Sequence, residues 1–150
     1  MIPCFYKGFL FFYKENYLYL LMNTNLMFSH KSDDWSTPLD FFNKLNDEFN
    51  FNYDPCPLRS KEDGLLEEWK GNVFINPPYS NIRKFLEKGI DELNKGNSTT
   101  LVYLLPARTD TKWFHDLIYN KAEIRFIKGR LKFGNSKNSA PFPSMLVIFK

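Results

Sequence analysis

Apolar residues recur along this chain with two different periods, which predict helices and strands in turn. Apolar positions at helical spacing predict a helix over residues 38–49 and a second one that begins after Ser80 or Asn81 and ends at Gly96. A third helix is expected around residues 113–118. The apolar faces of the first two helices consist of Phe41, Phe42, Leu45 and Phe49, and of Ile82, Phe85, Leu86, Ile90 and Leu93.

Short apolar runs predict strands between these helices, and the clearest of them covers residues 100–105. The other candidates are residues 51–53, 73–75, 124–127, 129–134 (a strand or a turn edge) and 144–149. Strands that alternate with helices over short connections predict an α/β layered fold with a mostly parallel sheet. The connection between the last two strands is too short for a crossover helix, so we expect an antiparallel hairpin at the sheet edge.

The start of the first helix carries a recognisable capping signal. Thr37 has a good N-cap side chain, Pro38 suits the first helical position, and Asp40 lies where a capping box places an acid. The sequence therefore predicts that the hydroxyl of Thr37 caps this helix. Trp35, just before it, is either a core anchor or the wall of a ligand pocket.

The composition is that of a globular protein, and 150 residues suit one domain. A net charge of +3 permits a polyanionic partner without requiring one. The two cysteines, Cys4 and Cys56, are not spaced as metal ligands, so we expect no metal and a reducing intracellular compartment.

The first 21 residues are crowded with aromatic side chains and differ from the rest of the chain. Lys7, Lys14 and Glu15 interrupt them, so no apolar stretch reaches the roughly 18–20 residues of a membrane span. We therefore expect residues 1–22 to be a dispensable extension and residues 23–150 to form a single domain. The alternative is an aromatic segment that binds a partner.

The tetrapeptide Asn76-Pro77-Pro78-Tyr79, at the end of a predicted strand, carries the strongest chemical signal. The amide oxygen of Asn76 and the carbonyl of Pro77, whose φ is fixed, are two acceptors that suit an amino group with two hydrogens. Tyr79 adds a flat ring on which a planar base or amide can stack. The alternative is a rigid turn between a strand and a helix.

A second candidate site follows the predicted strand 51–53. Asp54 would place a carboxylate at the carboxyl end of a parallel strand, where α/β sheets bind ligands. Pro55 and Pro57 stiffen the loop behind it. The alternative is that Asp54 is an ordinary turn residue.

These motifs occur in an order that resembles S-adenosylmethionine-dependent amino-methyltransferases, and more narrowly the small phage-type DNA N-6-adenine-methyltransferase (Dam) family. The resemblance runs from about Trp35 to the C-terminus. It rests on residues 35–38, 54–56, Trp69 with 76–80, 105–111, Gly129-Arg130 with Phe133, and Pro143-Ser144. It implies an abridged class I methyltransferase (Rossmann-like) sheet flanked by helices.

The resemblance also implies roles for these residues. Asn76, Pro77, Pro78 and Tyr79 would hold a flipped adenine, and the methyl donor S-adenosylmethionine would be bound by Trp35, Thr37, Pro38, Asp54, Pro55 and Cys56. Double-stranded DNA is the implied partner. Arg108, Lys112 and Arg130 lie in predicted loops and could contact its phosphates.

One departure from the family's fold concerns the donor site. Such methyltransferases usually carry a glycine-rich loop after the first strand, whereas here no glycine follows Asp54 until Gly64. The usual acid for the donor's ribose has no clear counterpart, and Glu62 and Asp63 are the candidates.

Two other functions fit the same residues. One is methylation of RNA or of a protein glutamine amide, because the tetrapeptide serves planar amines in general. The other is a catalytically inactive DNA-binding relative, which the missing glycines would favour. For the leading interpretation, a phage- or prophage-encoded DNA adenine methyltransferase, we expect the cytoplasm of a bacterial host.

Overall fold

The computed structural model describes residues 36–57, 63–133 and 138–150, all within one compact unit that spans residues 32–150. Its elements are α2 (Leu39–Phe49), β1 (Gly71–Ile75), α3 (Ile82–Asn94), β2 (Ser98–Pro106), the π-helix η1 (Phe114–Ile118), β3 (Glu123–Phe126) and β4 (Ser144–Phe149). The predictions for residues 1–22, Trp35 and Glu62 lie outside the described residues.

The four strands form one mixed sheet in the order β1-β2-β4-β3. β1 and β2 are parallel, whereas β4 runs antiparallel to both β2 and β3. The prediction of an α/β fold is confirmed, but a mostly parallel sheet is wrong for the described strand pairs, because β4 enters between β2 and β3. The last strand is antiparallel to its neighbours as expected, but its partner at the sheet edge is β3 and not the predicted strand 129–134, since residues 129–133 form no strand.

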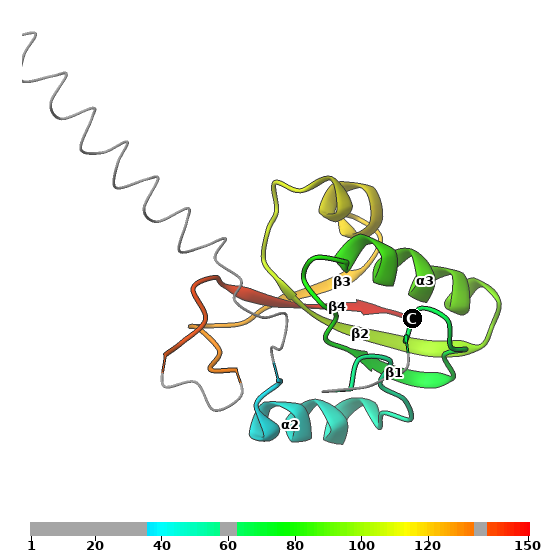
Figure 1. The fold of residues 1–150 in the computed structure, drawn as a ribbon, viewed down its shortest axis with the longest axis horizontal. Coiled ribbons are helices and arrows are strands. Elements are labelled where there is room, and N and C mark those ends of the chain that lie inside the picture. Colours follow the sequence, from blue (N-terminus) through cyan, green and yellow to red (C-terminus); the bar gives the residue numbers. More distant parts are fainter. Residues whose placement is uncertain (1–35, 58–62, 134–137) are drawn as a thin grey trace, which may run out of the picture. The chain divides into compact units, whose positions relative to one another are not determined.

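Alternate residues of the central strands enter two separate cores, as Figure 1 shows with α2 on one side of the sheet and α3 with η1 on the other. On β2, Leu101, Tyr103 and Leu105 face the α3 side, and Val102 and Leu104 face the α2 side. β4 alternates in the same way. The buried runs of both strands, residues 101–106 and 145–149, are therefore apolar, as expected for strands covered on both faces.

The predicted strand over residues 51–53 is reduced to a single parallel bridge between Tyr53 and Val73. The amide of Phe74 donates to the carbonyl of Tyr53 at 3.0 Å. This bridge places the chain beside β1, on the side away from β2, and running in the same direction. Asp54 therefore follows Tyr53 at the edge of the sheet where β1 and β2 also end.

The helices agree with their predicted apolar faces, but the cap of α2 differs. Its N-cap residue is Pro38, one position after the predicted one, and no side chain caps the helix. Asn81, one of the two predicted residues, occupies the N-cap position of α3 without a capping side-chain hydrogen bond, and Gly96, with φ +76°, follows the end of the helix. The hydroxyl of Thr37 is used elsewhere, in the site described next.

Candidate active site

The carboxyl edge of the sheet, where the bridge at Tyr53, β1 and β2 all end, brings the predicted motifs together. Asp54 follows the bridge, Asn76 follows β1, and Arg108 lies two residues after β2. These segments are adjacent and run in the same direction, so their final residues lie at one edge. The side chains of Asp54, Asn76 and Arg108 are neither fully buried nor fully exposed.

Asn76 is held by a residue almost forty positions earlier in the chain. Its amide nitrogen Nδ2 donates to Thr37 Oγ1 at 3.0 Å. The hydroxyl of Thr37, which the sequence predicts as the cap of α2, therefore accepts a hydrogen bond from the loop after β1. Because the amide nitrogen points to Thr37, the amide oxygen Oδ1 of Asn76 is directed away from it.

The rest of the loop is rigid and leads straight into α3. Pro77 is buried, and the carbonyl of Pro78 accepts a hydrogen bond from the amide of Asn81, the N-cap of α3, at 2.8 Å. Two consecutive prolines allow the backbone little freedom. The carbonyl of Pro77 is therefore held in a narrow range of directions, as the sequence predicts.

The ring of Tyr79 lies where the two cores meet at the carboxyl edge. Phe142 packs edge-on against it, with ring centroids 5.3 Å apart. Burial raises the pKa of the Tyr79 phenol, and the positive charge of Arg108 acts in the opposite direction. Arg108 and the tyrosine are thus electrostatic neighbours, although they belong to different loops.

Asp54 lies in a tight turn formed by its own side chain. Its Oδ1 accepts a hydrogen bond from the amide of Cys56 at 2.8 Å. Burial raises the pKa of Asp54, and this hydrogen bond only partly opposes the shift. Burial and the charges of Asp54 and Asp63 raise the pKa of the Cys56 thiol, so this cysteine is not a reactive thiolate.

Gly64 packs directly on the backbone that carries Asp54. A Cβ atom on Gly64 would lie 2.0 Å from the carbonyl oxygen of Pro55, so no side chain fits there. The carbonyl of Gly64 accepts a hydrogen bond from Trp69 Nε1 at 2.7 Å. Asp63, a predicted ribose ligand, is exposed and accepts from the amide of Leu65 at 3.0 Å.

The three residues predicted to contact DNA follow strands that end at this same edge of the sheet, but they differ in burial. Arg108 is half-buried, and its carbonyl accepts from Thr111 Oγ1 at 2.9 Å, which fixes the loop after β2. Lys112 and Arg130 are exposed. Neither makes an ion pair with a carboxylate of the described residues.

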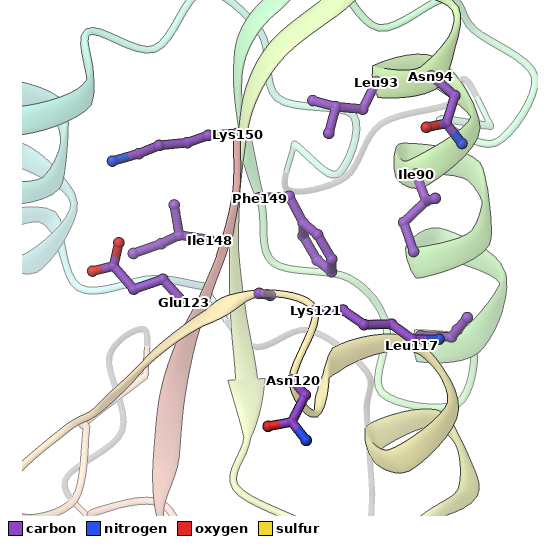
Figure 2. A pocket seen from close by; sticks show the side chains of 11 residues that line it. Ile90, Leu93, Asn94, Leu117, Asn120, Lys121, Glu123, Ile148, Phe149 and Lys150 are labelled. Carbon is purple, nitrogen blue, oxygen red and sulfur yellow. The ribbon is translucent and has the colours of Figure 1, made fainter.

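A hollow of about 640 Å³ lies at the opposite edge of the sheet, between the second half of α3, the turn after η1 and the end of β4. Figure 2 shows Ile90 and Leu93 of α3 opposite Phe149 of β4, with Asn120 on the turn after η1. None of the predicted site residues lines it. The candidate site is therefore the carboxyl edge and not this hollow.

The described residues contain neither a cluster of metal-ligating side chains nor a helix suited to span a membrane. No group of three or more histidine, cysteine, aspartate or glutamate side chains lies close enough together there to hold a metal ion. Within the same part of the chain, no helix has the length and apolar character needed to cross a membrane.

Comparison with known proteins identifies the family. The family model described as "DNA N-6-adenine-methyltransferase (Dam)" matches residues 24–150. The chain belongs to this family. It is thus a DNA adenine-N6 methyltransferase.

Two phage proteins are similar to this member of the Dam family. The DNA N-6-adenine-methyltransferase of Haemophilus phage HP1 is 31% identical over 137 residues, which cover 79% of each chain. The DNA N-6-adenine-methyltransferase of Escherichia phage T1 is 31% identical over 112 residues, 66% of this chain and 46% of that protein. No solved structure matches the chain significantly.

Sequence reasoning missed two residues that shape this site. Phe142 supports the ring of Tyr79, yet it lies between two prolines in the loop before β4, where no periodic pattern marks it. In the sequence Gly64 is only the first glycine after Asp54, and its contact with Pro55 exists only in the folded loop. The block around Pro143 was the only sequence signal near Phe142.

Proposed function

We propose that this chain transfers a methyl group from S-adenosylmethionine to the exocyclic N6 amine of an adenine flipped out of double-stranded DNA. The observation that carries the proposal is the hydrogen bond from Asn76 Nδ2 to Thr37 Oγ1. It joins two motifs of the Dam family at the edge of the sheet where Asp54 and Arg108 also lie.

The amine would be held by two oxygen acceptors of the tetrapeptide. Thr37 fixes the nitrogen of the Asn76 amide, so Oδ1 is oriented to accept one hydrogen of N6, and the carbonyl of Pro77 accepts the other. Both acceptors hold the lone pair of N6 in one direction, so they contribute chiefly by positioning. N6 would gain a bond to the methyl carbon as the bond between that carbon and the sulfonium sulfur breaks, which leaves S-adenosylhomocysteine, and N6 would then lose one proton to water.

The adenine ring would stack on Tyr79. An enzyme that modifies a base must take the base out of the helical stack, and an aromatic side chain replaces part of the lost stacking. Phe142 packs on the edge of the Tyr79 ring and holds its orientation. Pro78 keeps the tyrosine next to the two acceptors by restricting the backbone between them.

S-adenosylmethionine supplies a methyl group attached to a positively charged sulfur. Its charge fits Asp54, a largely buried carboxylate that makes no ion pair with a cation of the described residues. A cationic ligand beside Asp54 would offset the cost of burying this carboxylate. Pro55 and Cys56 would shape the loop on one side of the donor. Thr37 and Pro38, at the start of α2, would line the other side, together with Trp35 just before them.

The strand directions support a class I methyltransferase sheet in abridged form. β1, β2 and β3 run in one direction and β4 alone is reversed, while the bridge at Tyr53 adds a parallel segment beside β1. Donor and base would then bind outside the carboxyl ends of the parallel segments, as ligands do in open α/β sheets. Because both similar proteins belong to phages, we expect the chain to act in the cytoplasm of a bacterial host.

The test is transfer of labelled methyl from S-adenosylmethionine to DNA, followed by nucleoside analysis. We expect label in N6-methyldeoxyadenosine and none in RNA or in a glutamine peptide. Folded protein that labels no DNA of varied sequence would contradict the proposal. Calorimetry with S-adenosylmethionine then separates the two alternatives. An inactive relative should show no binding heat, whereas an enzyme that methylates RNA or a glutamine amide should still bind the donor.

A further inference from the structure

Phe126, the last residue of β3, is a large apolar side chain exposed at the carboxyl edge of the sheet. It is 67% exposed, and its neighbour Ile127 turns back toward the α2-side core. Fixed aromatic rings are usually buried, so an exposed one at the edge of a candidate active site calls for an explanation.

The segment that follows Phe126 presents three cations to solvent. Leu131 and Phe133 pack against the α2-side core, and the amide of Ala140 donates to the carbonyl of Leu131 at 2.7 Å. With Ile127 they anchor the segment to this core. The cations Lys128, Arg130 and Lys132, which lie between or beside these anchors, are exposed.

These three cations make no ion pair with a carboxylate in the part of the chain that the structure describes. The cation just before Phe126 behaves differently. Arg125 contacts both carboxylate oxygens of Glu48, at 2.7 and 2.9 Å, and also Glu123. Uncompensated positive charge on β3 and its loop therefore begins only after Phe126.

The position of Phe126 fits a duplex whose adenine has entered the candidate site. β3 is three strand spacings from β1 in the sheet, which is roughly 14 Å. This distance is similar to the width of a DNA major groove, about 12 Å, so one duplex can reach both places. Phosphates would meet the cations, and the ring would meet the bases.

We propose that Phe126, Lys128, Arg130 and Lys132 form a DNA-docking strip. In this strip Phe126 stacks between bases beside the extruded adenine, while the three cations contact phosphates. The proposal rests on the proposed function, because it assumes that an adenine leaves the duplex. Apolar wedges of this kind lower the cost of disturbing a base stack. Charge complementarity selects DNA as the occupant, in preference to a second copy of this chain.

The decisive experiment uses two duplexes, made after the methylated adenine has been mapped by sequencing. One duplex pairs the target adenine with thymine, and the other mispairs it, which lowers the cost of extrusion. Phe126→Ala should weaken binding to the paired duplex at least about fivefold and to the mispaired duplex less than about twofold. Phe126→Trp should restore binding. The matched control is Tyr119→Ala, an exposed aromatic beside the far hollow, which should leave DNA binding unchanged.

The cations are tested through the salt dependence of binding to an arbitrary duplex. Each of Lys128→Gln, Arg130→Gln and Lys132→Gln should make the negative slope of log K against log salt less steep by about 1. Lys150→Gln, at the opposite edge, should not change it. Unchanged slopes, equal losses on both duplexes, or a change of oligomeric state in Phe126→Ala would overturn the proposal. The salt dependence of binding can be measured without methylation. If the three cation variants show the expected change but the wild type methylates no DNA, the proposed function is contradicted and the docking strip is not.

Discussion

The two ends of the sheet use polar side chains in opposite ways. At the amino end, Glu92 is only 2% exposed, yet Lys88 and Asn97 both donate to its carboxylate. At the carboxyl end, Asp54 has only the amide of Cys56 as a neighbouring donor among the described residues, and burial raises its pKa. The amino end therefore pairs its buried charge within the protein, whereas we propose that the carboxyl end keeps the carboxylate of Asp54 for a cationic ligand.

The largest effect should come from Asn76→Ala, which removes an acceptor from the carboxyl end. We expect the rate of methyl transfer to fall at least about 100-fold, because an oriented acceptor acts mainly at the transition state. The free energy of unfolding should change by no more than about 1–2 kcal/mol, the value of the lost bond to Thr37. Single-turnover kinetics and urea unfolding measure the two quantities.

The control for this substitution is Asn94→Ala in the hollow at the opposite edge. It should leave the rate of methyl transfer unchanged. If the two asparagine variants had equal rates, the distinction between the two ends would fail.

Asp54→Asn should come next, with an affinity for S-adenosylmethionine about 10–100-fold lower, since it removes a charge but keeps the acceptor for Cys56. Wild-type methylation should fall as the pH is lowered through the raised pKa of Asp54. Calorimetry and pH–rate profiles provide these measurements.

The stability of the wild type should depend on Asp54 in the reverse direction. A raised pKa means that the folded chain binds this proton more tightly than the unfolded chain does. The contribution of Asp54 is therefore present below its unfolded pKa and is lost as the pH rises through its folded pKa. Asp54→Asn should be at least as stable as the wild type near neutral pH, and a clear loss of stability there would contradict this account.

Glu92→Gln should lower the free energy of unfolding by about 1–3 kcal/mol near neutral pH. Burial alone would raise the pKa of Glu92, but the hydrogen bonds from Lys88 and Asn97 and the charges of Lys88 and Lys95 lower it overall. Its contribution is therefore present above the unfolded pKa and is lost as the pH falls through the folded pKa. Urea unfolding at several pH values measures this pH dependence of the free energy of unfolding. The folded variant should methylate DNA at the wild-type rate.

The smallest effect should come from a pair of buried serines, one at each end. Ser98 Oγ donates to the carbonyl of Trp69 at 3.2 Å. Ser144 is only 1% exposed, and its Oγ has no hydrogen-bond partner in the part of the chain that the structure describes. Ser98→Ala should lower the free energy of unfolding by about 1 kcal/mol, and Ser144→Ala should leave it unchanged or raise it slightly. Equal losses in thermal unfolding would remove this contrast.

The sequence determined the local elements and the order of the family motifs. The apolar faces of α2 and α3 and the buried runs of β2 and β4 are readable because helices and strands repeat over a few residues. The Asn-Pro-Pro-Tyr loop was readable too, because proline restricts its own backbone wherever it stands.

Only the tertiary structure decided which distant groups meet. Thr37 looks like a helix cap in the sequence, but its hydroxyl binds Asn76, and β4 enters the sheet between two earlier strands. Nothing in the sequence marks Gly89, inside α3, as a close contact, yet a Cβ there would lie 1.9 Å from the hydroxyl of Tyr103. Such contacts depend on how whole elements pack, and no short stretch of sequence contains that information.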